Sequence, residues 1–283
     1  MLSIITPVYN GRTFIDACIQ VVIEQDCAEV EHIIVDGLST DGTLNIIQQY
    51  AEKYSHIRWV SEKDMGQSDA MNKGLCLAQG DVIGILNVDD FYQPGVLNRV
   101  AGLFKTLPVP TLLVGNCNVL DASDKVMYVN KPKRLRFTDL LLGTTVFEMP
   151  LNPSAYFYHQ ALHQKIGFYK VDEHYLMDLD FLLRAVRVAH VKYIDETWGN
   201  LRVIEGTKTV IDVQSGQHQQ RIQTLLESYW NTLPVFQRWP IKLSYAFFSS
   251  RVVSPLVYFW KRPQELSWRL KARLAKVFGR GPK

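Results

Sequence analysis

The sequence has few cysteines and no long uncharged apolar run. Its four cysteines in 283 residues lack metal-site spacing, so they predict reduced thiols and favour a cytosolic compartment. No uncharged apolar stretch reaches the roughly 20 residues that cross a bilayer. No charged leader precedes the first strand-like run, so a signal peptide is not expected. With 47% hydrophobic and 21% charged residues, the composition excludes disorder, collagen and coiled coil as descriptions of the whole chain.

Acidic residues are nearly missing from the last part of the chain. Residues 238–283 contain eleven Lys or Arg and one acid, Glu265, which gives a local charge of +10. Residues 1–237 contain 20 basic and 27 acidic residues, which gives −7. The formal net charge of +3 therefore combines an acidic body with a basic tail, and such a tail is expected to meet an anionic surface.

Strand and helix patterns alternate over the first hundred residues. This alternation predicts an α/β fold with a mainly parallel sheet flanked by helices. The predicted strands cover residues 2–6, 32–35, 57–61 and 82–87, and the predicted helices cover residues 14–25, 43–54 and 68–78. There is no internal repeat and no low-complexity linker, but the alternation ends near residue 212. We therefore expect a domain over residues 1–212, with halves 1–100 and 101–212, followed by a helical, basic extension over residues 213–283.

Polar residues cluster where each predicted strand ends. They are Tyr9 and Asn10, the segment 36–41, the segment 62–67, and the pair Asp89 and Asp90. In parallel α/β sheets, ligands bind at the carboxyl ends of the strands. The sequence therefore predicts a polar ligand site at this edge of the sheet.

Asp89 and Asp90 directly follow an apolar strand. Two adjacent acids at the mouth of a buried strand are costly unless something positive binds there. A divalent cation that bridges diphosphate oxygens is the natural partner, because Mg²⁺ prefers a few carboxylates together with phosphate and water. The alternative is an Asp-Asp turn or cap before Phe91.

The two loops nearest the start of the chain allow two interpretations each. Asp41 or Thr40 can cap the helix that begins near Thr43, whereas Asp36 could accept hydrogen bonds from a base or a ribose. The segment 6–10 is either a loop that breaks the strand or a loop that lines a nucleotide.

The order and spacing of four segments resemble the family 2 glycosyltransferases, which have the GT-A fold (nucleotide-diphospho-sugar transferase, Rossmann-like). These segments are residues 3–10, 35–43, 61–74 and 84–90, and the resemblance extends over about residues 1–210. The third segment, with Asp69, Asn72 and Gly74, is the most specific and looks like members that extend polysaccharide and lipid-linked glycan chains.

The resemblance implies a donor site and a metal site. Asp89 and Asp90 match the DXD-type motif, with Asp90 as the direct ligand of Mg²⁺ or Mn²⁺, although Asn87 stands where many members have a further Asp. The residues that would bind the donor nucleotide-sugar are Thr6, Pro7, Val8, Tyr9, Asp36, Ser39, Asp69, Asn72, Lys73, Asp89, Arg202 and Lys208. Arg202 and Lys208 lie in a segment similar to the family's closing loop, in which Ile204 replaces a common His. Without the resemblance they would be solvated loop charges.

The second half of the chain resembles the acceptor side of the family. Asn152 and Ser154 fall in the segment that meets the acceptor, and Asp180 is placed on the same side. Asp178 falls at the position of the catalytic base, with Met177 where many members have Glu. The alternative is that Asp178 and Asp180 are only first-turn acids favoured by the helix dipole.

The chemistry of glycosyl transfer explains these residue types. A carboxylate can take the proton of the acceptor hydroxyl as that oxygen attacks the anomeric carbon. A cation and basic side chains stabilise the departing nucleoside diphosphate. One base on the face opposite the leaving group gives inversion without a covalent nucleophile.

The basic tail contains a second pattern. Residues 265–278 place Leu266, Leu270, Leu274, Val277 and Phe278 on one helical face among basic residues, which is typical of an interfacial amphipathic helix. The alternative is a helix packed on the catalytic domain or on a second copy. Binding of nucleic acid is not expected, because no recognised nucleic-acid module accompanies the tail.

Together these features predict an inverting glycosyltransferase. It would move a sugar from a nucleotide-sugar, expected to be UDP-linked, to a lipid-linked or polysaccharide acceptor in cell-surface glycan synthesis. It would act as a peripheral protein at the cytoplasmic face of the membrane. Two alternatives are a sugar-nucleotide nucleotidyltransferase, disfavoured because a basic Gly-rich loop after the first strand is absent, and a non-catalytic membrane-bound module, disfavoured by the intact Asp89, Asp90 and Asp178.

Overall fold

The computed structural model describes residues 1–143, 147–250 and 253. The described residues form two compact units: residues 1–137 with 148–225, and the described part of residues 138–147 with 226–283. The elements that lie wholly in the first unit are β1 (Leu2–Val8), α1 (Arg12–Ile23), β2 (Val30–Asp36), α2 (Thr43–Lys53), β3 (Ile57–Ser61), α3 (Gln67–Leu77), β4 (Val82–Ile85), β5 (Phe91–Tyr92), α4 (Val96–Phe104), β6 (Thr111–Leu120), β7 (Val126–Asn130), the 3-10 helix η1 (Pro153–Ala155), β8 (Tyr156–His159), α6 (Ala161–Ile166), α7 (Met177–Ala185), β9 (His190–Arg202) and α8 (Lys208–Gln214).

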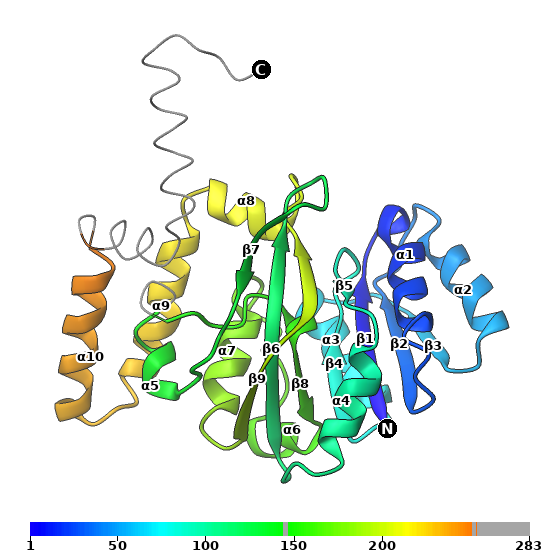
Figure 1. The fold of residues 1–283 in the computed structure, drawn as a ribbon. Helices are drawn as coiled ribbons and strands as arrows, with labels where there is room; N and C mark the ends of the chain where they lie inside the picture. Colours follow the sequence, from blue (N-terminus) through cyan, green and yellow to red (C-terminus); the bar gives the residue numbers. More distant parts are fainter. Residues whose placement is uncertain (144–146, 251–252, 254–283) are drawn as a thin grey trace, which may run out of the picture. The chain divides into compact units, whose positions relative to one another are not determined.

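The first unit is built on one nine-stranded sheet. Its strands follow the order β3-β2-β1-β4-β8-β6-β9-β5, and β7 pairs with β6 (Figure 1). The pairings from β3 to β4 are all parallel. β8 is antiparallel to both β4 and β6, whereas β6 and β9 are parallel. The mainly parallel arrangement expected from the sequence therefore describes the first half of the sheet, and the whole sheet is mixed.

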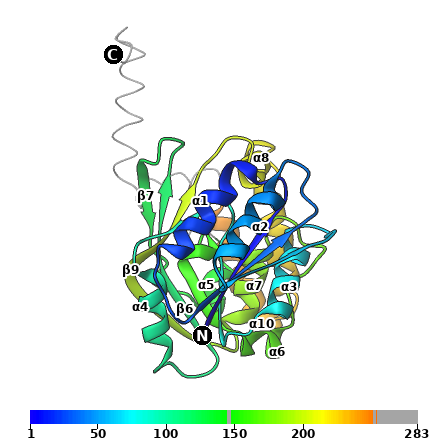
Figure 2. The same ribbon diagram turned by 90° about the vertical axis from the view of Figure 1, so that its right-hand side faces the viewer.

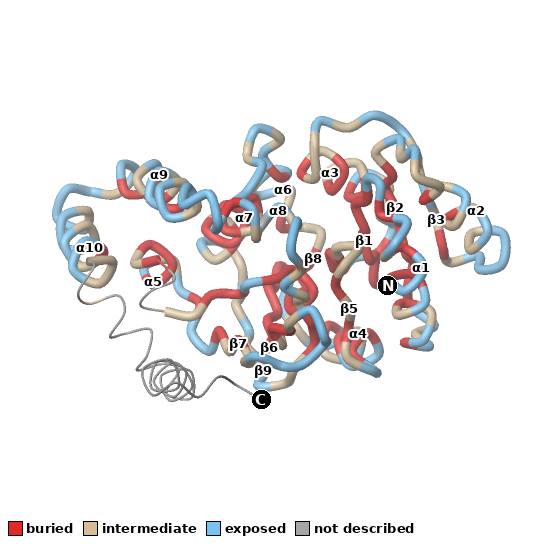
Figure 3. The backbone as a smooth tube through the Cα atoms, turned by 90° about the horizontal axis from the view of Figure 1, so that it is seen from above, coloured by how far each residue is buried: buried red, intermediate tan, exposed pale blue. Residues whose placement is uncertain are grey.

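Helices cover both faces of the parallel half. All seven residues of β1 and of β2 are buried, as expected for parallel strands with helices on both faces. Val8 packs in one cluster with Ile15 of α1 and Ile47 of α2, whereas Ile5 points at Gly74 of α3. Figure 2 shows α1 and α2 in front, and Figure 3 shows α3 on the other side of β1 and β2.

The reversal of direction at β8 determines where the site lies. Gly84 of β4 is opposite Phe157 of β8, and Val82 is opposite His159. Because the two strands run in opposite directions, β8 begins at the edge where β4 ends. The segment that leads into β8 therefore lies beside the residues that follow β4, which are Asn87 to Asp90.

The second unit is helical where it is described. It contains most of α5 (Phe137–Leu140), the end of α9 (His218–Trp230) and all of α10 (Val235–Phe248). Trp230 connects the parts of this unit. Its indole N–H donates to Leu141 O at 3.2 Å, and the centre of its ring lies 5.0 Å from the centre of the Tyr245 ring. The expected helical extension is thus seen up to residue 248, and the segment 265–278 lies outside the described residues. None of the helices described is both long and apolar enough to cross a bilayer.

Two helical glycines offer a test of this packing. A Cβ at Gly74 of α3 would lie 2.3 Å from Cγ2 of Ile5, whereas a Cβ at Gly102 of α4 would meet nothing within 4 Å. We expect Gly74→Ala to lower the free energy of unfolding by about 1–3 kcal/mol through overpacking. The matched Gly102→Ala should raise it by about 0.5–1 kcal/mol. Urea titrations measure both, and equal effects of the two changes would contradict the close approach of α3 to β1.

Candidate active site

Asp90 is a buried carboxylate at the end of β4. Its side chain is 2% exposed. Oδ2 accepts hydrogen bonds from Asn87 Nδ2 at 2.9 Å and from Asn152 Nδ2 at 2.6 Å, whereas Oδ1 has no hydrogen-bond partner in the described structure. Burial and the neighbouring charge of Asp89 raise the pKa of Asp90 to about 8. Burial also raises the pKa of Asp89, against the influence of Arg202.

These two carboxylates fit a divalent cation. A buried oxygen without a partner is costly, and a second carboxylate beside it makes ionisation of both costlier still. A cation would satisfy the free oxygen and permit ionisation of the pair. No group of three or more His, Cys, Asp or Glu that could hold a metal occurs among the residues that the structure describes. The remaining ligands would therefore come from diphosphate and water, a common arrangement for Mg²⁺.

Asn87 has a defined role in this site. Its Nδ2 donates to Asp90, and its Oδ1 accepts from Gln67 Nε2 of α3 at 2.9 Å. A carboxylate at position 87 could not donate to Asp90. Asn87 thus replaces the further Asp that many family members have at this position, and its amide orients the Asp90 carboxylate.

Asp178 lies in the first turn of α7 and is half-buried. The Tyr156 hydroxyl donates to Asp178 Oδ1 at 3.0 Å. Burial raises the pKa of Asp178 to about 6, although the Tyr156 hydrogen bond and the positive charge of Lys208 both oppose that rise. A carboxylate with this pKa is ionised at neutral pH and is basic enough to accept a proton.

One short segment holds both carboxylates. Asn152 caps η1, with its Oδ1 accepting from Ser154 N at 2.9 Å, and its Nδ2 donates to Asp90. Tyr156, the first residue of β8, donates to Asp178. We call residues 152–156 the bridging segment, because it connects the candidate metal site to the candidate base within five residues.

The segment before α7 is attached to α3. Asn72 exchanges two hydrogen bonds with the backbone of Tyr169, at 2.8 and 2.9 Å, and Ser68 Oγ donates to Glu173 O at 3.0 Å. Glu173 Oε1 in turn accepts from the N–H groups of Tyr175 and Leu176, just before α7. The structure therefore places Asn72, a predicted donor ligand, where it positions the segment that precedes Asp178.

The predicted nucleoside loop is mostly part of the core. Thr6, Pro7 and Val8 belong to β1 and are buried, and Thr6 Oγ1 lies 2.9 Å from His32 Nε2. Only Tyr9 presents its side chain to solvent, at 65% exposure.

Asp36 and Ser39 have internal partners. Asp36 is buried and accepts from Ser61 Oγ at 2.6 Å and from Ser39 N at 3.1 Å. Ser39 Oγ accepts from Asn10 N at 2.8 Å. In the structure these residues hold the loop after β2 against the loop after β1.

A close approach around Gly37 was not singled out from the sequence. A Cβ at Gly37 would lie 2.4 Å from Asp64 Oδ2 and 3.5 Å from Cδ2 of Tyr9. Asp64 Oδ1 accepts from Gly66 N at 2.9 Å. Asp64 therefore faces the exposed Tyr9 across a glycine, and its place in the third motif was the signal that could have identified it.

Lys73 and Asp69 organise the loop before α3. Lys73 Nζ donates to Lys63 O at 2.6 Å and pairs with Glu62 at 3.0 Å and with Asp69 at 3.5 Å. Asp69 Oδ2 also accepts from Met65 N at 3.1 Å. Both predicted donor residues are thus engaged within the loop 62–66.

Arg202 and Lys208 lie on the two sides of the loop that follows β9. Arg202 ends β9, pairs with Asp124 at 2.7 Å and donates to Asp89 O at 3.4 Å. Lys208 begins α8, and its ammonium lies 5.0 Å from the ring of Tyr175. Arg202 is thus next to the pair of carboxylates Asp89 and Asp90. Lys208 is close enough to Asp178 to influence its pKa. Asp124, in the turn between β6 and β7, was missed because a surface turn acid gives no sequence signal.

Two predicted acceptor residues lie behind the site. Asp180 is buried and pairs with Lys170 at 2.7 Å and with Arg184 at 2.8 Å. Ser154 is buried, and its hydroxyl donates to Asn152 Oδ1. These contacts hold α7 and the bridging segment in place.

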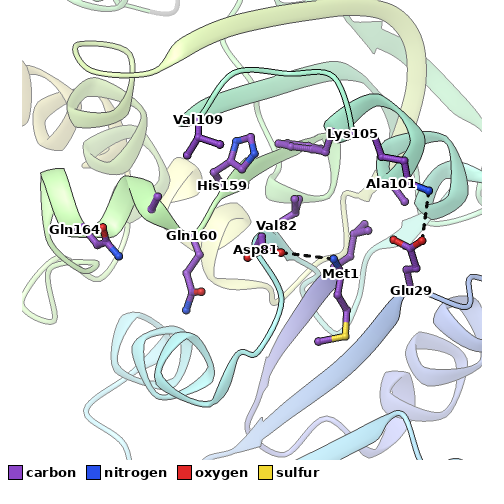
Figure 4. Close-up of a pocket in the computed structure, with 13 residues that line it drawn as sticks. Met1, Glu29, Asp81, Val82, Ala101, Lys105, Val109, His159, Gln160 and Gln164 are labelled. Atoms are coloured by element: carbon purple, nitrogen blue, oxygen red, sulfur yellow. Dashed lines mark hydrogen bonds and ion pairs between the residues drawn. The ribbon is translucent and has the colours of Figure 1, made fainter.

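A pocket of about 450 Å³ lies at the opposite edge of the sheet. Met1, Asp81, Lys105 and His159 are among its lining residues (Figure 4). They flank the amino ends of β1 and β4, whereas the candidate carboxylates follow the carboxyl end of β4. We therefore do not assign the donor to this pocket.

Comparison with known proteins identifies the family of the chain. The sequence model of glycosyl transferase family 2 matches residues 3–147. A PGL/p-HBAD biosynthesis glycosyltransferase of Mycobacterium bovis (strain BCG / Pasteur 1173P2) is 31% identical over 188 residues, which are 65% of this chain and 69% of that protein.

Two solved structures share the fold. S. aureus TarS in complex with UDP-GlcNAc has a TM-score of 0.67 and 20% identity over 88% of this chain and 73% of its own. A mannosyltransferase from Pyrobaculum calidifontis in complex with GDP-Man and Mn²⁺ has a TM-score of 0.63 and 17% identity over 97% and 80%. The family model covers just over half of the chain, and the mycobacterial relative is matched over more than two thirds of its length. The chain therefore belongs to glycosyl transferase family 2 and is a glycosyltransferase.

Proposed function

We propose that the chain transfers a sugar, with inversion, from a UDP-sugar to a polysaccharide or lipid-linked acceptor in bacterial cell-envelope glycan synthesis. The observation that carries this proposal is the bridging segment, in which Asn152 and Tyr156 hold Asp90 and Asp178. A cation site and a base linked in this way match what single displacement on a nucleotide-sugar requires. The complex of TarS with UDP-GlcNAc supports the choice of nucleotide.

The donor would bind along the carboxyl edge of β1 and β4. Tyr9 and Asp64 would contact the nucleoside, because they meet at Gly37 on the exposed side of that edge. Asp89 and Asp90 would hold a divalent cation, which neutralises charge on the diphosphate when bound. Arg202 lies beside Asp89 and would face the same diphosphate together with Lys208.

Asp178 would act as the general base. The acceptor hydroxyl gives its proton to the Asp178 carboxylate while its oxygen forms a bond with the anomeric carbon. The bond from that carbon to the diphosphate oxygen breaks on the opposite face, and the electron pair leaves with the nucleoside diphosphate. Tyr156 keeps the carboxylate oriented, since its hydroxyl donates to Oδ1. Asn152, Ser154 and Asp180 contribute by positioning this acceptor side.

We also propose that residues 1–212 carry catalysis and that residues 213–283 attach the enzyme to the cytoplasmic face of the membrane. The support is the excess of ten positive charges over residues 238–283. Basic segments near a membrane gain affinity from anionic lipid. Such an attachment would bring the site close to a lipid-borne acceptor.

Donor binding tests the proposed function. We expect one member of a panel of UDP-, GDP- and dTDP-sugars, a UDP-sugar, to raise the melting temperature when Mn²⁺ is present, because a ligand that binds only the folded state stabilises it. Asp90→Asn should lose the part of the shift that depends on the metal. Asp81→Asn, an exposed acid at the opposite edge, is the matched control. If no nucleotide-sugar shifts the transition, the proposed function fails.

Replacing the proposed base tests the chemical step. Asp178→Asn should lower kcat about 10²- to 10⁴-fold, because the variant cannot take the proton, while donor binding stays near that of the wild type. Asp172→Asn, an exposed acid in the segment before α7, should leave turnover unchanged. Wild-type turnover by Asp178→Asn would show that another group is the base.

The pH profile tests the contact between Tyr156 and Asp178. The acid limb of kcat/KM should fall as the pH drops through about 6, where the Asp178 carboxylate gains a proton. The Tyr156 hydroxyl stabilises the charged carboxylate, so Tyr156→Phe should raise the pKa of Asp178 and move this limb to higher pH. A lost hydrogen bond of about 1 kcal/mol corresponds to a shift of about 0.7 pH unit. An acid limb that stays in place or moves to lower pH would contradict the assignment.

A further inference from the structure

Helix α10 exposes a row of large apolar side chains. Phe236, Trp239, Leu243 and Phe247 are 75%, 59%, 66% and 60% exposed. Their spacing of three, four and four residues places them on one face of the helix. Figure 3 shows α10 mainly in the colours of exposed and intermediate residues. We call these four side chains the α10 apolar face.

The packing of the second unit explains which face of α10 is covered. Tyr245 is the buried residue of the helix. Its ring meets Trp230 at 5.0 Å and lies against Gly143, where a Cβ would come within 3.0 Å of it. Tyr245 projects from the side of α10 opposite Leu243 and Phe247. The helix thus packs through one side and presents a second apolar side outward, and an exposed apolar patch of this kind marks an interaction site.

The charge of the sequence that follows the helix points to one occupant. Residues 251–283 contain nine Lys or Arg and one acid, Glu265. A dimer formed through α10 would contain two such segments of like charge, which is unfavourable. An anionic bilayer would instead attract them, and Trp and Phe are enriched where membranes meet water.

We propose that the α10 apolar face inserts into the surface of an anionic lipid bilayer. The helix has 14 residues, or about 21 Å at 1.5 Å per residue, against the roughly 30 Å of a hydrocarbon core. It therefore lies in the plane of the interface and does not cross it. Arg238 and Lys242 do not extend from this face: Arg238 bonds to Asn231 O and Leu233 O, and the Lys242 ammonium lies 5.8 Å from the centre of the Trp230 ring.

This inference rests on the proposed membrane association and assigns it to a described helix, distinct from the segment 265–278. Arg238 also stabilises the start of the helix, because its Nη2 donates to Asn231 O and Leu233 O, both at 2.9 Å. These hydrogen bonds stabilise the helix that carries the α10 apolar face in the absence of lipid.

Vesicle sedimentation of the full-length protein tests the proposal. The wild type should sediment with vesicles that contain phosphatidylglycerol and only weakly with phosphatidylcholine alone. The variant with Phe236→Ser, Trp239→Ser, Leu243→Ser and Phe247→Ser should lose at least about tenfold in affinity, because it has no apolar face to insert. The control, Val126→Ser with Met127→Ser, removes exposed apolar side chains from β7 and should bind as the wild type does.

Fluorescence quenching by brominated lipid locates the inserted residues. Trp239 should account for a measurable share of the quenching, so Trp239→Phe should reduce it. Unchanged donor binding and an unchanged melting temperature show that the serine variant is folded. If that variant sediments like the wild type, or if quenching is the same in Trp239→Phe, the proposal is overturned and attachment lies elsewhere in the chain.

The same samples distinguish the remaining outcomes. A lipid-free wild type that is dimeric, with a serine variant that is monomeric, would assign the face to a second copy and overturn the proposal. A wild type that does not bind anionic vesicles would contradict membrane association altogether. Neither result affects the test of donor binding, so failure of the transferase proposal stays distinguishable.

Discussion

The burial of the Asp90 carboxylate is the constraint on which the rest of the site depends. Two amides donate to one of its oxygens, and the other oxygen has no partner among the described residues. Its pKa rises to about 8, so the folded state binds a proton that the unfolded state releases above pH 4. Its contribution to stability is therefore lost as the pH rises from about 4 through 8. A bound cation would offset this loss. The stability of the folded state would therefore depend on the cation and on the diphosphate that completes its ligands.

The arrangement of the candidate site follows from β8, the strand that runs antiparallel to its neighbours β4 and β6. Because β8 is antiparallel to β4, the bridging segment begins beside Asp90 and ends at Tyr156, which donates to Asp178. Helix α3 completes the arrangement: Gln67 bonds to Asn87, and Ser68 and Asn72 hold the segment before α7. The candidate cation site and base are thus fixed to the same short segment and to the same helix, both on rigid elements, as efficient catalysis requires.

The sequence was sufficient for the family and the parallel half of the sheet, because strand alternation and motif spacing are local signals. It could not show which polar residues face outward. Asp36 and Asn72 form hydrogen bonds inside the protein with Ser61 and Tyr169, partners that lie far away in sequence. It also missed Asp64 and Tyr156, since their roles depend on neighbours brought together by tertiary packing. The family assignment favours glycosyl transfer over the two alternative functions.

The proton count of metal binding is the most direct test of the claim about Asp90. With a pKa of about 8, Asp90 is mostly protonated at pH 7, and a cation must displace that proton. Titration calorimetry with Mn²⁺ and UDP, in buffers of different ionisation enthalpy, should show close to one more proton released by the wild type than by Asp90→Asn. It should also show much weaker Mn²⁺ binding by that variant. Equal proton release, or equal Mn²⁺ affinity in the two proteins, would contradict the account.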